Sequence, residues 1–254
     1  MAELLIERDR PGILLLRLNR PERRNALSTS LLTEIADALE SADKSVCCAV
    51  ITGSDKVFAA GADIQEIADK DQAAALADPR IALWGRIRAF EKPLIAAIEG
   101  WCLGAGCELM MCCDLVVAGA DAKFGQPETN LGIMPGAGGT ATLARLVGRG
   151  LANKMVLLGE PITAQEAKAA GLIVDIAGTG GALSAAMEMA NKMALRAPIA
   201  LRRAKASIKA AFELPHQEHL LLERRLFASL FDTADKREGI AAFLEKRPPV
   251  WQGD

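Results

Sequence analysis

Two glutamates of this chain lie in surroundings where a carboxylate is unexpected. Glu108 follows the Gly-Ala-Gly turn 104–106 in an otherwise apolar stretch, and Glu128 follows Pro127 in the segment FGQPE. Charged side chains are almost never fully buried unless they are paired or used. Two carboxylates in one site push their pKa values apart, so that one donates a proton while the other accepts one. The pair indicates acid–base chemistry, although either glutamate alone could merely complement a helix dipole.

Two glycine-containing turns supply a second ingredient, residues 59–63 (AAGAD) and 103–106 (LGAG). Backbone N–H groups at the start of a helix lack partners and point outward. If both turns face one cleft, the N–H groups of Ala62 and Ala105 would share one oxygen that gains negative charge, as an oxyanion hole does. Ordinary tight turns have the same spacing, so the spacing alone leaves both interpretations open.

The sequence lacks the residues that several other kinds of chemistry require. The sequence has no GxxxxGK[ST] phosphate loop, and GAGCEL carries Leu109 where a dinucleotide-binding GxGxxG needs glycine. Its two histidines, His216 and His219, fall in the helical tail and are expected at a helix surface, far from any glycine-flanked serine. Its six cysteines show no paired CxxC spacing, so we interpret them as small buried hydrophobic residues rather than metal ligands.

The composition excludes further classes. With a formal net charge of −2, the 254-residue chain lacks the Lys and Arg excess of a nucleic-acid or polybasic membrane surface. Its longest apolar runs are too short to span a bilayer, and its first twelve residues contain no secretory h-region. We therefore expect no nucleic-acid partner, no membrane insertion and a cytoplasmic location.

The elements that must position these residues alternate between strands and helices. Apolar runs predict strands at 13–19, 46–53 and 92–100, and helical spacing predicts helices at 28–45, 80–91, 140–159 and 163–171. After residue 114 we expect a strand, a short second strand and a glycine-rich loop. From about residue 183 the chain is nearly all helical, and no internal repeat is visible. This pattern predicts an α/β core over 1–195 and a helical region over 196–254.

Three long segments carry a resemblance to a known family. FAAGADIQEI, GWCLGAGCELMMCCDLVVAG and AKFGQPETNLGIMPGAGGT resemble, in the right order, the signature segments of the enoyl-CoA hydratase (crotonase) family. NRPERRNAL near the start and REGIAAFLEKRPP near the end are similar to that family too. The similarity runs from about residue 4 to residue 253, and three ordered motifs are far more specific than any one glycine triplet.

The resemblance implies an acyl-CoA thioester substrate whose carbonyl oxygen lies between the N–H groups of Ala62 and Ala105. It implies that Glu108 holds and deprotonates a water at C3, and that Glu128 delivers a proton to C2. The reaction would be reversible hydration of a trans-2-enoyl-CoA to a 3-hydroxyacyl-CoA. No metal or redox cofactor is implied, since coenzyme A is part of the substrate.

The resemblance also implies a set of residues that line the CoA and acyl groups: Arg24, Ala60, Gly61, Asp63, Ile64, Gly106, Gly136 and Phe227. Phe227 would pack on the adenine bound to a neighbouring subunit. The chain departs from the family pattern at Gln65, where the family often has a lysine, which removes a cation near the CoA.

The implied fold is α/β: a crotonase (ClpP-like) spiral of ββα units with a helical C-terminal region that packs trimers, often paired into hexamers. The composition of this region also indicates, independently of the resemblance, that it packs against a partner. Residues 219–231 (HLLLERRLFASLF) are too apolar for a freely exposed helix.

Alternative functions remain within and outside the family. An enoyl-CoA Δ3–Δ2 isomerase needs only the second glutamate, whereas a non-catalytic assembly or RNA-binding relative predicts lost glutamates or a basic surface. Within the family, the segment 154–172 most resembles 2,3-dehydroadipyl-CoA hydratases of phenylacetate catabolism. A distal acyl carboxylate would need a cation, for which Arg80, Arg86 and Arg88 are candidates, although surface solvation is the simpler explanation for them.

Overall fold

Two sheets form the core of the protein. The structure is a computed structural model that describes residues 2–254. Within these residues, a six-stranded sheet has the order β1-β2-β3-β5-β7-β10 and a four-stranded sheet the order β4-β6-β8-β9. The strands of the first are β1 (Leu4–Glu7), β2 (Ile13–Leu18), β3 (Cys48–Thr52), β5 (Leu94–Ile98), β7 (Leu115–Gly119) and β10 (Asp175–Ala177). Those of the second are β4 (Val57–Ala59), β6 (Trp101–Leu103), β8 (Lys123–Gly125) and β9 (Ile162–Thr163).

A ββα unit recurs three times along the chain. Each unit gives one strand to the larger sheet and the next strand to the smaller one: β3 and β4, β5 and β6, β7 and β8. Helices follow each pair, namely α2 (Gln72–Leu76) and α3 (Arg80–Arg88), then α4 (Ala105–Met110), then α5 (Gly139–Leu157). Neighbouring units pair in parallel, so the ends of successive strands meet at one edge. The repeated unit agrees with the expected spiral.

The larger sheet is covered on both faces, which explains its continuous apolar strands. Leu14, Leu16 and Ile51 lie in the main hydrophobic core together with buried side chains of α1 (Thr29–Glu40) and α3. Ile13, Leu15 and their same-face neighbours pack instead against α7 (Ala182–Ala194). The strands predicted at 13–19, 46–53 and 92–100 are confirmed as β2, β3 and β5.

The helix N-termini follow their capping residues. The Ser28 hydroxyl accepts a hydrogen bond from Leu31 N at 3.0 Å, so α1 begins at Thr29, and the helix ends at Glu40 rather than at residue 45. Thr163 forms a capping box with Glu166 at the start of α6 (Ala164–Ala169). The helix predicted at 140–159 is interrupted at Gly148, whose φ of 76° and ψ of 161° break the helical path.

Neither β1 nor β10 is predicted from the sequence, and β8 is the only predicted strand of the smaller sheet. β4 lies within the segment predicted as a loop, β6 lies in the segment read as turn and helix, and β9 was not predicted. Each has two or three residues, too few for a periodic pattern, and each pairs with a strand distant in the sequence. As a further difference, α4 ends at Met110, so Cys112 and Cys113 lie after the helix.

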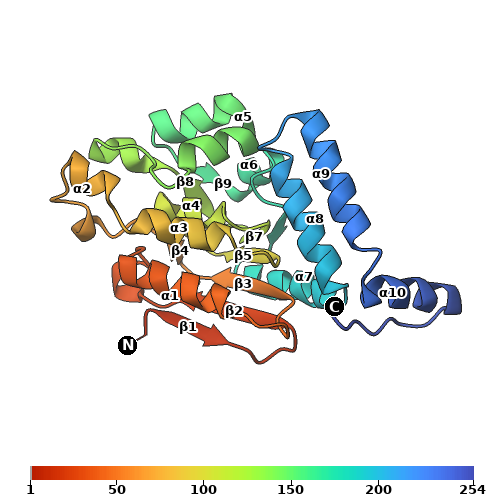
Figure 1. Cartoon of the computed structure of the whole chain (residues 1–254). Helices are drawn as coiled ribbons and strands as arrows, with labels where there is room; N and C mark the ends of the chain where they lie inside the picture. Colours follow the sequence, from red (N-terminus) through yellow and green to blue (C-terminus); the bar gives the residue numbers. More distant parts are fainter. Residues whose placement is uncertain (1) are drawn as a thin grey trace.

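The C-terminal helices lie to one side of the sheets. In Figure 1, α8 (Pro198–Ala210) and α9 (His216–Ser229) run alongside each other and α10 (Ala234–Glu245) projects beyond them. Neither α8 nor α9 contains a buried residue. His219 does not simply face solvent as expected, because its Nε2 lies 2.9 Å from Ser207 O of α8. No helix of residues 2–254 has the length and apolar character needed to cross a membrane.

Candidate active site

Glu108 lies in the first turn of α4 and is almost fully buried, with 4% of its surface exposed. Gly104 turns the chain from β6 into α4 with φ 51° and ψ −126°, a conformation that side chains rarely adopt. Gly106 then packs α4 tightly on β4, since a Cβ there would lie 2.3 Å from Ala59 O. The Glu108 Oε1 atom accepts hydrogen bonds from Ala137 N and Gly139 N, both at 2.7 Å.

Glu128 lies in the first turn of a short 3₁₀ helix, Pro127–Leu131, directly after β8, and is half-buried. Gln126 beside it is fully buried. With its amide nitrogen facing the carboxylate, Gln126 donates to both Glu128 oxygens at 2.9 and 3.1 Å. Sequence reasoning missed Gln126; the only available signal was an amide among apolar neighbours at the end of a predicted strand.

The two glutamates share one site. A Cβ placed on Gly139 would lie 2.9 Å both from Glu108 Oε1 and from the Gln126 amide, and Gln126 in turn contacts Glu128. A Cβ on Gly104 would lie 3.2 Å from Glu128 Oε1. The space between the carboxylates is therefore bounded by glycines and one amide.

The two carboxylates differ in the groups that act on their pKa values. Burial raises the pKa of Glu108, opposed by the N–H groups of Gly139 and Ala137 and by the charge of Arg88. Burial raises the pKa of Glu128 to about 7, opposed by its own backbone N–H and reinforced by the charge of Glu108. The two N–H groups that donate to one Glu108 oxygen thus oppose the effect of burial on the pKa of Glu108, whereas the charge of Glu108 adds to the effect of burial on the pKa of Glu128.

The two turns beside the glutamates each carry a backbone N–H group without an acceptor among residues 2–254, that of Ala62 and that of Ala105. Leu27 bridges the 59–63 turn by donating to Gly61 O at 2.8 Å and accepting from Asp63 N at 3.0 Å, which leaves the Ala62 N–H facing away. The N–H of Ala105 begins α4 and has no intrahelical partner. Among residues 2–254, neither N–H donates to an acceptor. The turns touch, since a Cβ on Gly104 would lie 3.5 Å from Gly61 Cα.

Comparisons with known proteins agree with this geometry. The sequence model of the enoyl-CoA hydratase/isomerase family matches residues 8–254. The chain belongs to this family. It is 52% identical over 255 residues to the 2,3-dehydroadipyl-CoA hydratase of Escherichia coli (strain K12), covering 100% of both chains. The mitochondrial enoyl-CoA hydratase of Pongo abelii is 44% identical over 92% of this chain and 81% of its own.

Solved structures of the family have the same fold. The crystal structure of an enoyl-CoA hydratase from Bacillus anthracis superposes with a TM-score of 0.93 at 34% identity, over 99% of this chain and 100% of that one. An enoyl-CoA hydratase from Mycobacterium tuberculosis H37Rv superposes with a TM-score of 0.92 at 32% identity, over the full length of both chains. These likenesses show the crotonase fold expected from the sequence motifs.

Five of the residues that the family pattern assigns to CoA binding, namely Arg24, Ala60, Gly61, Asp63 and Ile64, lie in one connected loop region. The Arg24 carbonyl accepts a hydrogen bond from Ala60 N at 3.1 Å, with Arg24 itself in the left-handed region at φ 51°. The Asp63 carboxylate is paired with Arg20 at 3.0 Å and caps the 3₁₀ helix Ile64–Glu66. Asp63 thus positions the turn, and exposed Ile64 and the backbone remain for a ligand.

Asn25 is a positioning residue that sequence reasoning missed. It is buried, adopts a left-handed conformation at φ 54°, and donates through Nδ2 to Val57 O and Phe58 O of β4 at 3.2 and 3.1 Å. Its Oδ1 accepts from Arg20 N at 2.9 Å. Asn25 therefore ties the backbone of Arg20 to β4, the strand that leads into the 59–63 turn.

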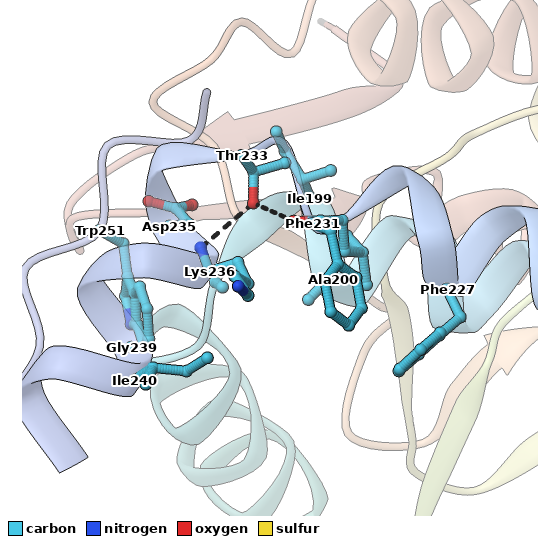
Figure 2. Close-up of a pocket in the computed structure, with 12 residues that line it drawn as sticks. Ile199, Ala200, Phe227, Phe231, Thr233, Asp235, Lys236, Gly239, Ile240 and Trp251 are labelled. Carbon is cyan, nitrogen blue, oxygen red and sulfur yellow. Dashed lines mark hydrogen bonds between the residues drawn. The ribbon is translucent and has the colours of Figure 1, made fainter. Parts of the chain in front are cut away.

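Three other predicted residues lie in different settings. Gly106 is buried beneath β4, and Gly136 is exposed in the loop before α5. Phe227 lies on α9, where its ring meets Phe231 edge-on at 5.0 Å between centroids (Figure 2). It lines a cavity of about 440 Å³ formed by the C-terminal helices and Trp251, which contains none of the glutamate-site residues.

Proposed function

We propose that this chain catalyses the reversible addition of water to a trans-2-enoyl-CoA, giving a 3-hydroxyacyl-CoA. The carrying observation is the pair of carboxylates, one accepting hydrogen bonds from two backbone N–H groups and the other with a pKa of about 7, beside two unpaired N–H groups. An acyl-CoA thioester is the substrate class on which its named relatives act.

The proposed steps add one water molecule across the C2–C3 double bond. Glu108 takes one proton from water as the oxygen bonds to C3, and the C2–C3 π electrons shift to form an enolate on the thioester oxygen. Ala62 N–H and Ala105 N–H stabilise that oxygen, each by about 3–4 kcal/mol in the transition state. Glu128 then gives its proton to C2. Solvent exchange returns the proton from Glu108 to Glu128.

An isomerase is the closest competing function, and the fixed position of Glu108 favours hydration over it. Isomerisation moves a proton between C4 and C2 and needs no water-activating carboxylate. The decisive assay supplies crotonyl-CoA and follows loss of the enoyl-thioester absorbance with formation of 3-hydroxybutyryl-CoA. Conversion of a 3-enoyl-CoA without hydration of crotonyl-CoA would refute the proposal. Inactivity towards both would instead favour the non-catalytic relative.

The pH dependence follows from the raised pKa values. Hydration needs Glu108 ionised and Glu128 protonated, and dehydration needs the reverse, so each direction requires one proton on the pair. We therefore expect bell-shaped kcat/KM profiles in both directions. Activity is lost as pH rises through about 7, where Glu128 ionises, and as pH falls through a value above that of an ordinary glutamate. A rate that rises through neutral pH would contradict this assignment.

We further propose a dicarboxylic enoyl-CoA as the preferred substrate, because of the 52% identity to the 2,3-dehydroadipyl-CoA hydratase. Of the three candidate cations for the distal acyl carboxylate, two have carboxylate partners within the chain: Arg80 pairs with Asp78, and Arg86 pairs with Asp37 and Glu40. Arg88 is the third candidate. We expect kcat/KM for 2,3-dehydroadipyl-CoA to exceed that for crotonyl-CoA in steady-state assays. A strong preference for crotonyl-CoA would end the idea.

We propose that the C-terminal helices pack against other copies of the chain in a homotrimer or a dimer of trimers, in the cytoplasm. Large apolar side chains on α9 and α10 are exposed, among them Leu221 (63%), Phe243 (81%) and Leu244 (73%). Figure 2 shows Phe227 and Ile240 bordering the same apolar cavity. Light scattering should give a trimeric or hexameric mass, and Phe243→Asp with Leu244→Asp should lower it. A monomeric wild-type mass would contradict this proposal.

A further inference from the structure

Arg88, the last residue of α3, contacts the segment that holds Glu108. Its Nη2 donates to Ala137 O, and a Cβ on Gly138 would lie 3.0 Å from the same nitrogen. The guanidinium carbon lies 5.7 Å from the centroid of the Trp84 ring, so the buried indole supports the side chain from one side. Arg88 is therefore held between the core and the loop.

Arg88 binds the peptide group that joins Ala137 to Gly138, and this group lies between the two peptide groups that bind Glu108. Ala137 N and Gly139 N donate to Glu108, and the intervening carbonyl, Ala137 O, accepts from Arg88. Gly136 and Gly138 contribute no side chains to anchor this segment, and Gly138 has a φ of 103°. A shift of the Ala137 carbonyl would rotate both neighbouring N–H groups, so the Arg88 contact fixes their direction.

Arg88 differs from the other two arginines of α3. Arg80 and Arg86 are neutralised by Asp78 and by Asp37 with Glu40, whereas no carboxylate of residues 2–254 lies within 4.0 Å of the Arg88 guanidinium. Its positive charge acts instead on Glu108. The other titratable groups beside it are Cys112, after α4, and Lys209, on α8, whose Nζ donates to Arg88 O at 2.9 Å.

We propose that Arg88 is a positioning residue for Glu108: it fixes the Ala137–Gly139 segment that holds this carboxylate and supplies the positive charge that faces it. The consequence for the proposed hydratase, on which this inference rests, is a division of labour. The charge of Arg88 favours the ionised form of Glu108, which burial disfavours. No arginine acts on the pKa of Glu128, which burial raises to about 7. Arg88 thus adds to the N–H groups of Gly139 and Ala137 in favouring Glu108 as the base, with Glu128 as the acid.

The test compares Arg88→Gln and Arg88→Lys with the wild type, using crotonyl-CoA because its acyl group has no distal charge. In Arg88→Gln we expect kcat to fall by about 100-fold through misplacement of Glu108, with KM changed far less. The acidic limb of its kcat/KM profile should move to higher pH, because Glu108 loses the facing charge. Arg88→Lys keeps the charge without the planar fork, so its acidic limb should stay near the wild-type position while kcat still falls.

The matched control is Arg86→Gln, the same change two residues earlier in α3. It removes the pairs with Asp37 and Glu40 and should leave kcat and the pH profile unchanged. An Arg88→Gln profile that superimposes on the wild type overturns the inference, whether or not the variant is less stable.

Failure of the proposed function is recognised separately, because the wild type would then not hydrate crotonyl-CoA. In that case, carbon NMR titration of the carboxyls, with Glu108→Gln used to assign the signal, tests the inference directly. The Glu108 titration should move to higher pH in Arg88→Gln, and an unmoved titration overturns the inference.

Discussion

Glu108→Gln is expected to lower kcat/KM for crotonyl-CoA hydration by about 1,000-fold, the range typical of a lost acid–base group. Glutamine has the same size, and its amide oxygen can still accept from Ala137 N and Gly139 N, so the loop should keep its place. What is lost is a group that takes the proton of water. Stopped-time product analysis with purified variant measures the effect, and thermal unfolding checks the fold.

Glu128→Gln is the companion to this variant. Because Glu128 is assigned to proton transfer at C2, its replacement should abolish both hydration and any 3-enoyl to 2-enoyl conversion. Glu108→Gln should reduce hydration far more than isomerisation. Retention of more than a tenth of wild-type hydration in Glu108→Gln, with the fold intact, would falsify the role of Glu108 as the water-activating base.

The second large effect is expected from Gly104→Ala. The φ of 51° and ψ of −126° at Gly104 suit only glycine, and a new Cβ would lie 3.2 Å from Glu128 Oε1 and 3.5 Å from Gly61 Cα. Both Glu128 and the turns at 59–63 and 103–106 would have to shift. We expect kcat to fall by about 100- to 1,000-fold, the cost of a lost oxyanion donor, as measured in steady-state assays of crotonyl-CoA hydration.

Gly85→Ala is the matched control, since Gly85 lies within α3 and a Cβ there meets nothing within 4 Å. This change should leave kcat unchanged and stabilise the protein by about 0.5–1 kcal/mol, because alanine has the higher helix propensity. If Gly104→Ala were as active as Gly85→Ala, the assignment of the Ala105 N–H to the oxyanion hole would be wrong.

Much of the fold could be predicted from the sequence because the strands of the larger sheet are local signals. β3 and β5 are buried on both faces, so their apolar runs are continuous and end at a glycine or a charged residue. The Ser28 and Thr163 caps are likewise local, since each side chain bonds a backbone N–H three residues on. The smaller sheet was largely hidden, because β4, β6 and β9 exist only through pairing with distant strands.

The candidate site divides in the same way. Glu108 and Glu128 are already recognisable in the sequence as carboxylates in unusual surroundings, and so are the two glycine turns, since these features depend on adjacent residues. That both carboxylates face one space was decided by tertiary structure, through the approach of the Gly139 segment to Gln126 and Glu108. The upward shift of both pKa values was decided there too, because burial is a property of the packed chain.

The three arginines of α3 show the limit most clearly. In the sequence, Arg80, Arg86 and Arg88 are equivalent cations two or six residues apart. Their roles depend on partners up to 49 residues away: Asp37 and Glu40 neutralise Arg86, and Ala137 receives Arg88. The charge of each arginine and its position in the helix follow from the sequence. Which charge meets a carboxylate, and which remains to act on Glu108, depends on how distant segments pack.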